Sequence, residues 1–226
     1  MKNYKKKTIR RRARKKNNYK LALRKNPFPD VYYGKVCYAD QIELAPNAGA
    51  KAVYRFYANQ LYDIDRSNIG HQAMGTDELF AMGYRKYKVL GSRISLIMNQ
   101  DYSTGQSYSG NFITISLRED DSVSGSWTEV AERKGIAYTA TNRTKVVRLS
   151  KNFSAKRFFN VSNVKDADEL EGNLGNTGTG ALADKSAFYN ISAFPVNQGS
   201  NSYPTFVQVK IQFICMFYGR IPISGS

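Results

Sequence analysis

The 226-residue sequence has few of the side chains on which metal sites and disulfide scaffolds depend. It contains one histidine, His71, and two cysteines, Cys37 and Cys215. Two cysteines do not make a disulfide scaffold, and one histidine with no cysteine nearby in the sequence lacks the ligands of a zinc site. A Gly-x-Ser-x-Gly nucleophile elbow is also missing. We expect a reducing, intracellular site of folding, no enzymatic activity, no metal and no cofactor.

Long apolar segments are missing as well. The longest unbroken apolar run, Phe213–Tyr218, has six residues, whereas a membrane-spanning helix needs roughly 20. No apolar segment follows the basic N-terminal residues, so they do not form a secretory signal. We therefore expect no insertion into a membrane.

Acidic residues are absent from the first 29 positions, and Asp30 is the first. The chain has 34 basic and 18 acidic residues and a formal net charge of +16. Thirteen of the basic residues lie within residues 1–25, which leaves 21 basic and 18 acidic residues, or +3, for the rest. The thirteen are Lys2, Lys5, Lys6, Lys7, Arg10, Arg11, Arg12, Arg14, Lys15, Lys16, Lys20, Arg24 and Lys25.

These N-terminal residues form what we call the basic arm, residues 1–30, ahead of a folded domain over 31–226. The arm cannot bury enough apolar surface to order itself, and its like charges repel one another, so we expect it to be disordered. Its cations can neutralise phosphates without a fixed geometry, and Tyr4 and Tyr19 can stack on unpaired bases. The Lys and Arg runs also have the composition of a nuclear import signal.

The folded domain has the pattern of an all-β protein. Apolar residues occupy every second position of the last predicted strand, which places Cys215 on its core face. These residues are Val207, Val209, Ile211, Phe213, Cys215 and Phe217. Further strands are expected over 33–44, 51–58, 87–98, 111–118, 145–150 and 187–196, and in the third of these Leu90, Ile94, Leu96 and Met98 are expected on one face.

Helix is scarce, with short segments expected only near 77–85 and 127–134. The glycine-rich residues 172–180 match neither a phosphate-binding loop nor a dinucleotide fingerprint, and we interpret them as a surface loop. His71 is interpreted as a hydrogen-bonding loop residue. Many short strands with long loops and no βαβ rhythm predict a two-sheet sandwich or a barrel.

A second basic stretch lies between residues 133 and 165, which hold nine basic residues and no acid. Its centre is formed by Arg143, Lys145, Arg148, Lys151, Lys156 and Arg157. One interpretation is a second polyanion-binding surface, for nucleic acid or a sulfated glycan. The other is a solvated strand face that the acidic run at 166–171 balances.

One segment resembles a known family. Residues 70–78 (Gly-His-Gln-Ala-Met-Gly-Thr-Asp-Glu) lead into 84–94 (Tyr-Arg-Lys-Tyr-Lys-Val-Leu-Gly-Ser-Arg-Ile). This resembles the capsid proteins of circovirus-like, circular single-stranded DNA viruses, where a Gln-Pro-x-Gly-x-Asp loop precedes Tyr-x-x-Tyr-x-Val-x-x-Ser-x-Ile. Ala73 stands where the family often has proline. The arm, the strand around 53–56 and the closing strand with Tyr218-Gly219-Arg220 extend the resemblance.

The resemblance implies a single jelly-roll sandwich of eight antiparallel strands, with sheets B-I-D-G and C-H-E-F, and a T=1 icosahedral shell of sixty copies. Sixty arms would carry roughly 780 positive charges, enough for on the order of a thousand phosphates of packaged viral single-stranded DNA. Implied partners are other copies of the chain, host nuclear import receptors and a cell-surface receptor, for which a sulfated glycan is one candidate. The implied locations are the virion and, during assembly, the host nucleus.

Two other classes of protein are weighed against this one. A cellular or ribosomal RNA-binding protein with a basic tail predicts basic residues throughout the body, whereas the body here is only +3. A jelly-roll lectin or cupin enzyme predicts a metal-binding cluster that one histidine does not supply.

Overall fold

The computed structural model describes residues 29–47, 50–68, 71–100, 110–120, 125–141, 146–175, 182–197, 202 and 204–221. The thirteen cationic residues of the basic arm lie outside these ranges. In the described ranges, no helix has the length and apolar character needed to cross a membrane.

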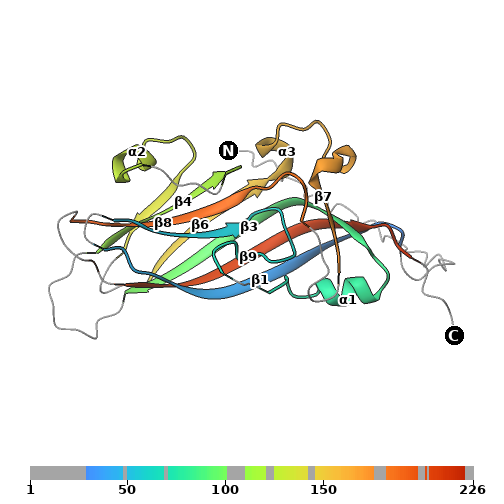
Figure 1. Cartoon of the computed structure of the whole chain (residues 1–226), viewed down its shortest axis with the longest axis horizontal. Helices are drawn as coiled ribbons and strands as arrows, with labels where there is room; N and C mark the ends of the chain where they lie inside the picture. The colour runs from blue at the N-terminus through green and yellow to red at the C-terminus, as the bar shows by residue number, and fades with distance from the viewer. Residues whose placement is uncertain are drawn as a thin grey trace, which may run out of the picture.

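Strands dominate the described part of the chain (Figure 1). They are β1 (Tyr32–Leu44), β2 (Ala52–Tyr57), β3 (Lys86–Gln100), β4 (Asn111–Arg118), β5 (Ala137–Ala140), β6 (Val147–Ser154), β7 (Glu171–Asn173), β8 (Phe188–Pro195) and β9 (Thr205–Tyr218). The helices are α1 (Thr76–Ala81), α2 (Trp127–Ala131), α3 (Ala155–Phe158) and the 3-10 turns η1 (Val164–Asp166) and η2 (Asp168–Leu170).

The strands form two antiparallel sheets. The first has the order β1-β9-β3-β6, with β7 paired to one end of β3, and the second has the order β2-β8-β4-β5. When β7 is set aside and the other eight strands are lettered B to I along the chain, these orders are B-I-D-G and C-H-E-F. This is the strand order of a jelly roll, so the predicted fold class is confirmed.

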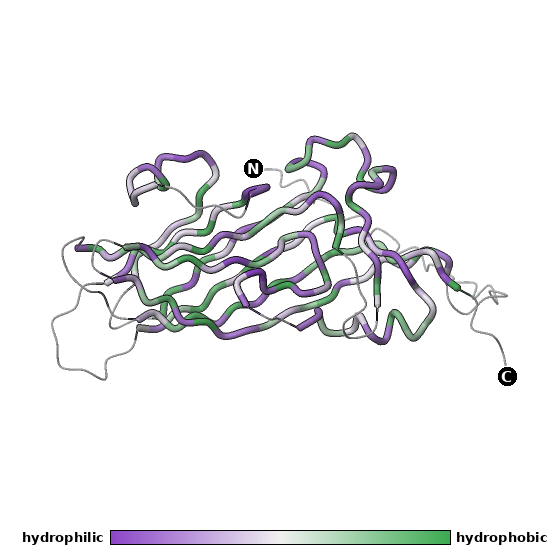
Figure 2. The backbone as a smooth tube through the Cα atoms, viewed as in Figure 1, coloured by the Kyte–Doolittle hydropathy of each residue, from purple (hydrophilic) through white to green (hydrophobic). Residues whose placement is uncertain are grey.

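The hydrophobic core lies between the two sheets. Along β9, Val207, Val209, Ile211, Phe213 and Cys215 are at most 2% exposed, and the residues between the first four of them are exposed. The tube in Figure 2 changes repeatedly between hydrophobic and hydrophilic along the strands for this reason. The predicted last strand and the predicted core position of Cys215 are therefore confirmed.

The expected face of β3 is correct only in part. Ile94 and the apolar residues that follow it at every second position are buried, but Leu90 is half-buried at a β-bulge between Val89 and Gly91. Before the bulge the buried apolar residues are Tyr87 and Val89. One extra residue in a strand moves all residues beyond it to the other face, which simple alternation does not anticipate.

The two expected helices are present but shorter than the predicted segments. α1 ends at Ala81. α2 begins at a capping box between Ser126 and Glu129 and ends at Ala131. The interpretation of 172–180 as a loop is wrong at its start, because Gly172 belongs to β7 and pairs with Tyr87. Residues 176–181 lie outside the described ranges.

Candidate nucleic-acid interface

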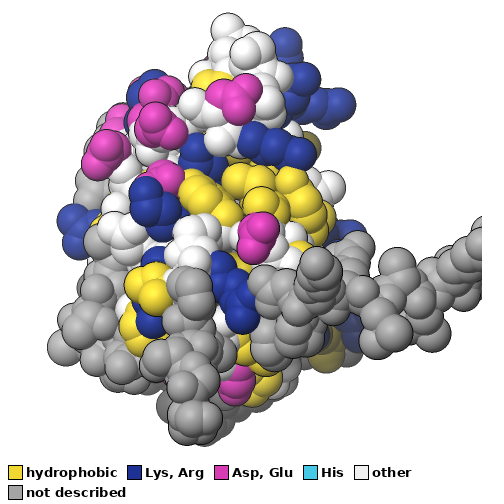
Figure 3. Space-filling model, turned by 90° about the vertical axis from the view of Figure 1, so that its right-hand side faces the viewer, with side chains coloured by type: hydrophobic (Ala, Val, Ile, Leu, Met, Phe, Trp, Pro, Cys, Tyr) yellow, Lys and Arg dark blue, Asp and Glu magenta, His cyan; other side chains and the backbone are white. Residues whose placement is uncertain are grey.

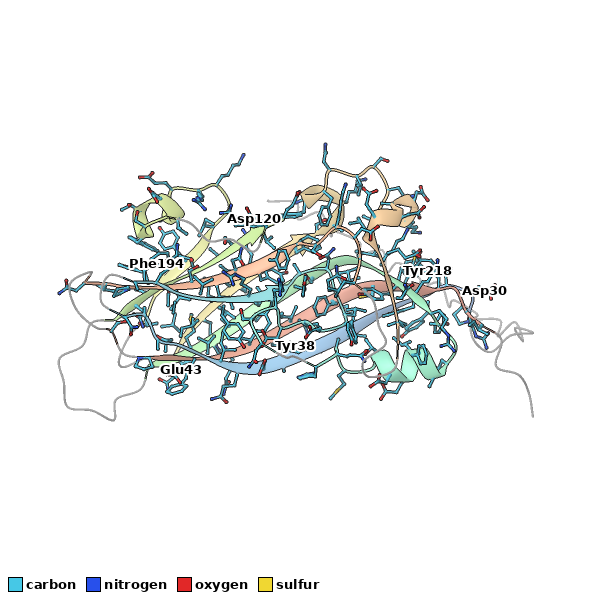
Figure 4. The ribbon with its side chains drawn as sticks, in the orientation of Figure 1. Asp30, Tyr38, Glu43, Asp120, Phe194 and Tyr218 are labelled. Carbon is cyan, nitrogen blue, oxygen red and sulfur yellow. The ribbon has the colours of Figure 1, made fainter. Side chains whose placement is uncertain are left out.

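The basic arm joins the folded domain at one end of the first sheet. Asp30, near the start of the described chain, and Tyr218, at the end of β9, lie at the same end of the molecule, and Glu43 lies at the opposite end (Figure 4). The Tyr84 hydroxyl donates a hydrogen bond to the carbonyl oxygen of Pro29 at 2.7 Å. The thirteen cations themselves are outside the described ranges, so their role stays a prediction.

Apolar side chains gather at this same end, and Lys, Arg, Asp and Glu side chains are scattered around them (Figure 3). The exposed apolar residues beside the start of β1 and the end of β9 include Val31, Tyr32, Tyr33 and Ile221, which are 43, 41, 49 and 53% exposed. They lie around one end of the molecule, where Tyr32 and Tyr33, consecutive in β1, point to opposite faces of the sheet.

The structure does not bring the second basic stretch onto one face. Arg148 is exposed on the outer side of β6, whereas Lys151, three positions later, lies on the other side of the strand and donates to the carbonyl oxygen of Gly135. Lys156 and Arg157 are exposed neighbours in α3 and line one shallow hollow of about 750 Å³. Arg143 and Lys145 lie outside the described residues.

The phenylalanines within this stretch pack against one another and against the core. Phe153 is 4% exposed, and its ring centroid lies 5.5 Å from that of Phe158 and 6.1 Å from that of Phe159. Phe158 and Phe159 are half-buried against the same cluster. These rings therefore stabilise the α3 segment.

The acidic run at 166–171 has lysine partners from elsewhere in the chain. Lys86 lies 2.6 Å from Glu171, and Lys185 lies 2.9 Å from Glu169. The Lys185 ammonium donates to Glu169 and holds the pKa of that carboxyl below its usual value. Lys88, buried at 2% exposure, donates to the carbonyl oxygen of Lys165 at 2.7 Å. None of these three lysines belongs to the second basic stretch. The pairs therefore do not support the interpretation in which the acidic run balances that stretch.

His71 and Cys215 occupy structural positions. The His71 ring lies 4.5 Å from the Tyr38 ring, and its two nitrogens contact the carbonyl oxygens of Gln72 at 2.8 Å and Ala39 at 3.3 Å. Complete burial raises the pKa of the Cys215 thiol. In the part of the chain that the structure covers, no three His, Cys, Asp or Glu side chains are grouped as metal ligands.

Sequence reasoning missed two cations that share the outer face of the first sheet with Arg148. Arg93 of β3 and Lys210 of β9 are both exposed there, and the Arg93 guanidinium donates to the Ser150 hydroxyl at 3.2 Å. The alternation in 207–213 already placed Lys210 on an outward position. The pairing of β3 with β6 and β9, which makes these residues neighbours, is not visible in the sequence.

The fold and strand order define a jelly-roll β-sandwich, and solved structures of similar layout are viral capsid proteins. The BFDV capsid protein in its 60-mer form has 11% identity and a TM-score of 0.47, with 88% of this chain and 100% of that chain covered. Its decameric form has 11% identity and a TM-score of 0.45, with 83% of this chain and 99% of that chain covered. The structure of Cocksfoot mottle virus has 14% identity and a TM-score of 0.43, with 85% of this chain and 97% of that chain covered. The assignment of the fold rests on the strand order.

The sequence matches no protein-family model and no curated protein.

Proposed function

We propose that this chain is a viral capsid protein whose folded domain builds the shell and whose basic arm packages the genome. The observation that carries the proposal is the separation of charge from fold. Thirteen cations without an acid occupy residues 1–25, and the jelly roll that follows is close to neutral. Such a division fits a protein in which one part contacts other copies of itself and the other part binds a polyanion.

The shell function is supported by the apolar end of the molecule. Exposed Val31, Tyr32, Tyr33 and Ile221 are costly in an isolated subunit and are stabilised when another subunit covers them. A low net charge on the domain also favours assembly, because many copies must lie side by side without strong mutual repulsion. We infer a shell of sixty identical copies from the resemblance of residues 70–94 to circovirus-like capsid proteins.

The packaging function is supported by the position of Pro29, where the arm meets the domain. The contact between Tyr84 and Pro29 fixes the point at which the arm leaves the domain, so that sixty arms in a symmetric shell would leave from equivalent points. Phosphate contacts by Lys and Arg do not depend on base sequence. We infer a domain boundary at residue 30 and, from the same resemblance, a circular single-stranded DNA genome.

Two further functions of the capsid protein follow from the same proposal. The Lys and Arg runs of the arm would bind host nuclear import receptors, which places assembly in the host nucleus. Surface loops would contact a receptor on the host cell. A fluorescent protein fused to residues 1–25 is expected in the nucleus, and the same fusion with the thirteen cations changed to glutamine is expected in the cytoplasm. Cytoplasmic fluorescence of the unchanged fusion would refute the import function.

The experiment that tests packaging compares the full chain with a variant in which all thirteen arm cations are changed to glutamine. Chain length and the folded domain are unchanged, so we expect particles of normal size with most of their nucleic acid lost. Nucleic acid content is read from the ratio of absorbance at 260 and 280 nm of gradient-purified particles. Normal nucleic acid content in the neutralised variant would contradict the proposal.

The alternative, a cellular or ribosomal RNA-binding protein with a basic tail, predicts a different outcome. Such a protein binds RNA as a subunit and forms no particles at any concentration. Gradient sedimentation of the unchanged chain therefore separates the two functions before any variant is made.

A further inference from the structure

The outer face of the β1-β9-β3-β6 sheet is open to solvent. On β9, Gln208, Lys210 and Gln212 point away from the core and are exposed. The outward residues of β3 and β6 are also largely exposed. The second sheet differs, because its outward polar residues Thr114 and Asn190 are completely buried. The first sheet thus offers a broad open surface, on which polar side chains lie beside the exposed apolar side chains of Ile97, Phe206 and Ile214.

Strand pairing brings three cations together on this surface. Lys210 pairs with Ser95 of β3, and Ser95 pairs with Ser150 of β6. Arg93 lies two residues from Ser95 in one direction, and Arg148 lies two residues from Ser150 in the opposite direction. With strands about 4.8 Å apart and about 3.3 Å per residue, Lys210 lies roughly 8 Å from Arg93 and roughly 12 Å from Arg148 between Cα atoms.

Acidic residues do not neutralise these three cations. Of the described residues that point outward from β1, β9, β3 and β6, one is acidic. It is Glu43, which pairs with Phe206 near one end of the sheet. The acidic run at 166–171 lies at the other end, near β7. The Arg93 guanidinium donates a hydrogen bond to the neutral hydroxyl of Ser150. The centre of the sheet therefore has a local positive charge, and hydroxyl groups, amide groups and the exposed Ile97 side chain lie around it.

We propose that this face, centred on Arg93, Arg148 and Lys210, is a second binding surface for single-stranded nucleic acid. The cations neutralise phosphates, and the amides of Gln208 and Gln212 donate hydrogen bonds to phosphate oxygens or base edges. An open sheet face accepts an extended single strand, as sheet-based nucleic-acid-binding domains do.

The arm delivers nucleic acid to this surface, and in that respect the inference rests on the proposed function. β1 begins three residues after Pro29 and forms one edge of the same sheet. A strand held by the arm is therefore at high effective concentration beside the sheet. The surface takes Arg148 from the predicted second basic stretch and adds two cations from outside that stretch.

The test uses full-length protein in which Arg93, Arg148 and Lys210 are changed to glutamine. The matched control changes Arg66, Arg118 and Lys185 to glutamine, which removes the same charge from residues that lie off this face. Binding of a 40-nucleotide oligothymidylate is measured by fluorescence anisotropy at several salt concentrations. Loss of three phosphate contacts reduces the slope of log K against log salt by about 2 for the face variant, and the control variant keeps the slope of the unchanged protein.

Equal slopes for the two variants would overturn the proposal, as would a larger loss in the control. A second readout is ultraviolet crosslinking of the same oligonucleotide to the unchanged protein, followed by mass spectrometry. Crosslinks in the peptides that contain β9 or β3 support the surface, and crosslinks confined to residues 1–25 contradict it. In that last case the arm still binds, so the proposed function stands while this inference fails.

Discussion

Replacement of Gly172 by alanine tests the packing that joins β7 to the first sheet. Gly172 pairs with Tyr87 of β3, whose ring is completely buried. A Cβ atom at residue 172 would lie 2.3 Å from Cζ of that ring and 2.5 Å from its hydroxyl oxygen, so the ring must move. Overpacking of this kind costs about 1–3 kcal/mol.

Movement of the ring also disturbs two hydrogen bonds. The Tyr87 hydroxyl donates to Oε1 of Gln60 at 3.1 Å and accepts from the backbone N–H of Leu61 at 3.2 Å. Gln60 in turn accepts from the backbone N–H of Ala183 at 2.9 Å. If one of these bonds is lost, about 1 kcal/mol is added, and we expect a total destabilisation of about 2–4 kcal/mol.

The assay is guanidinium unfolding of the unassembled subunit, followed by far-ultraviolet circular dichroism. The matched control is Asn173→Ala, because Asn173 is the next residue of β7 and is exposed. We expect the control to change the free energy of unfolding by less than about 0.5 kcal/mol. A Gly172→Ala variant as stable as the control would refute the packing argument.

Two further predictions concern buried polar side chains. The Lys88→Met substitution removes the donor to the Lys165 carbonyl oxygen but keeps an unbranched buried side chain. We therefore expect amide hydrogen exchange in residues 163–171 to become about tenfold faster. Unchanged exchange there would refute the role of this hydrogen bond. Burial, followed by the hydrogen bond from Tyr54 to Asp65, raises the pKa of Tyr54 above its usual value of 10.0. The folded state therefore keeps this proton to higher pH than the unfolded state, and stability is complete below pH 10 and decreases as the pH rises above it. In the folded protein, absorbance at 295 nm is expected to show some tyrosines that stay un-ionised until above pH 11, and denaturant is expected to lower their pKa toward 10. Titration of all 16 tyrosines together near pH 10 in the folded protein would contradict this.

Much of the fold could be predicted because alternation is a local property of the sequence. β9 shows it over its whole first half, and its apolar second half agrees with a strand that is covered on both sides near Met216. The bulge at Leu90 could not be predicted in this way, because it depends on how β3 pairs with β9, more than 100 residues later. Gly172 gave the signal of a loop, although its lack of a side chain is what lets β7 pack over the Tyr87 ring.

The candidate site was only partly predictable for a related reason. The charge of the arm is a property of consecutive residues and is visible at once. The face centred on Arg93, Arg148 and Lys210 combines three strands, and only the pairing of those strands makes the three cations neighbours. In contrast, Arg148 and Lys151 are close in sequence but lie on opposite sides of β6.

The central claim is that the folded domain assembles into a closed shell. Electron microscopy of the purified full-length protein tests it most directly, with a Tyr33→Asp variant that adds charge to the exposed apolar end as a comparison. The account predicts closed particles of one size for the unchanged chain and fewer or no particles for the variant. Unchanged protein that stays monomeric at every concentration and salt condition tested would contradict it.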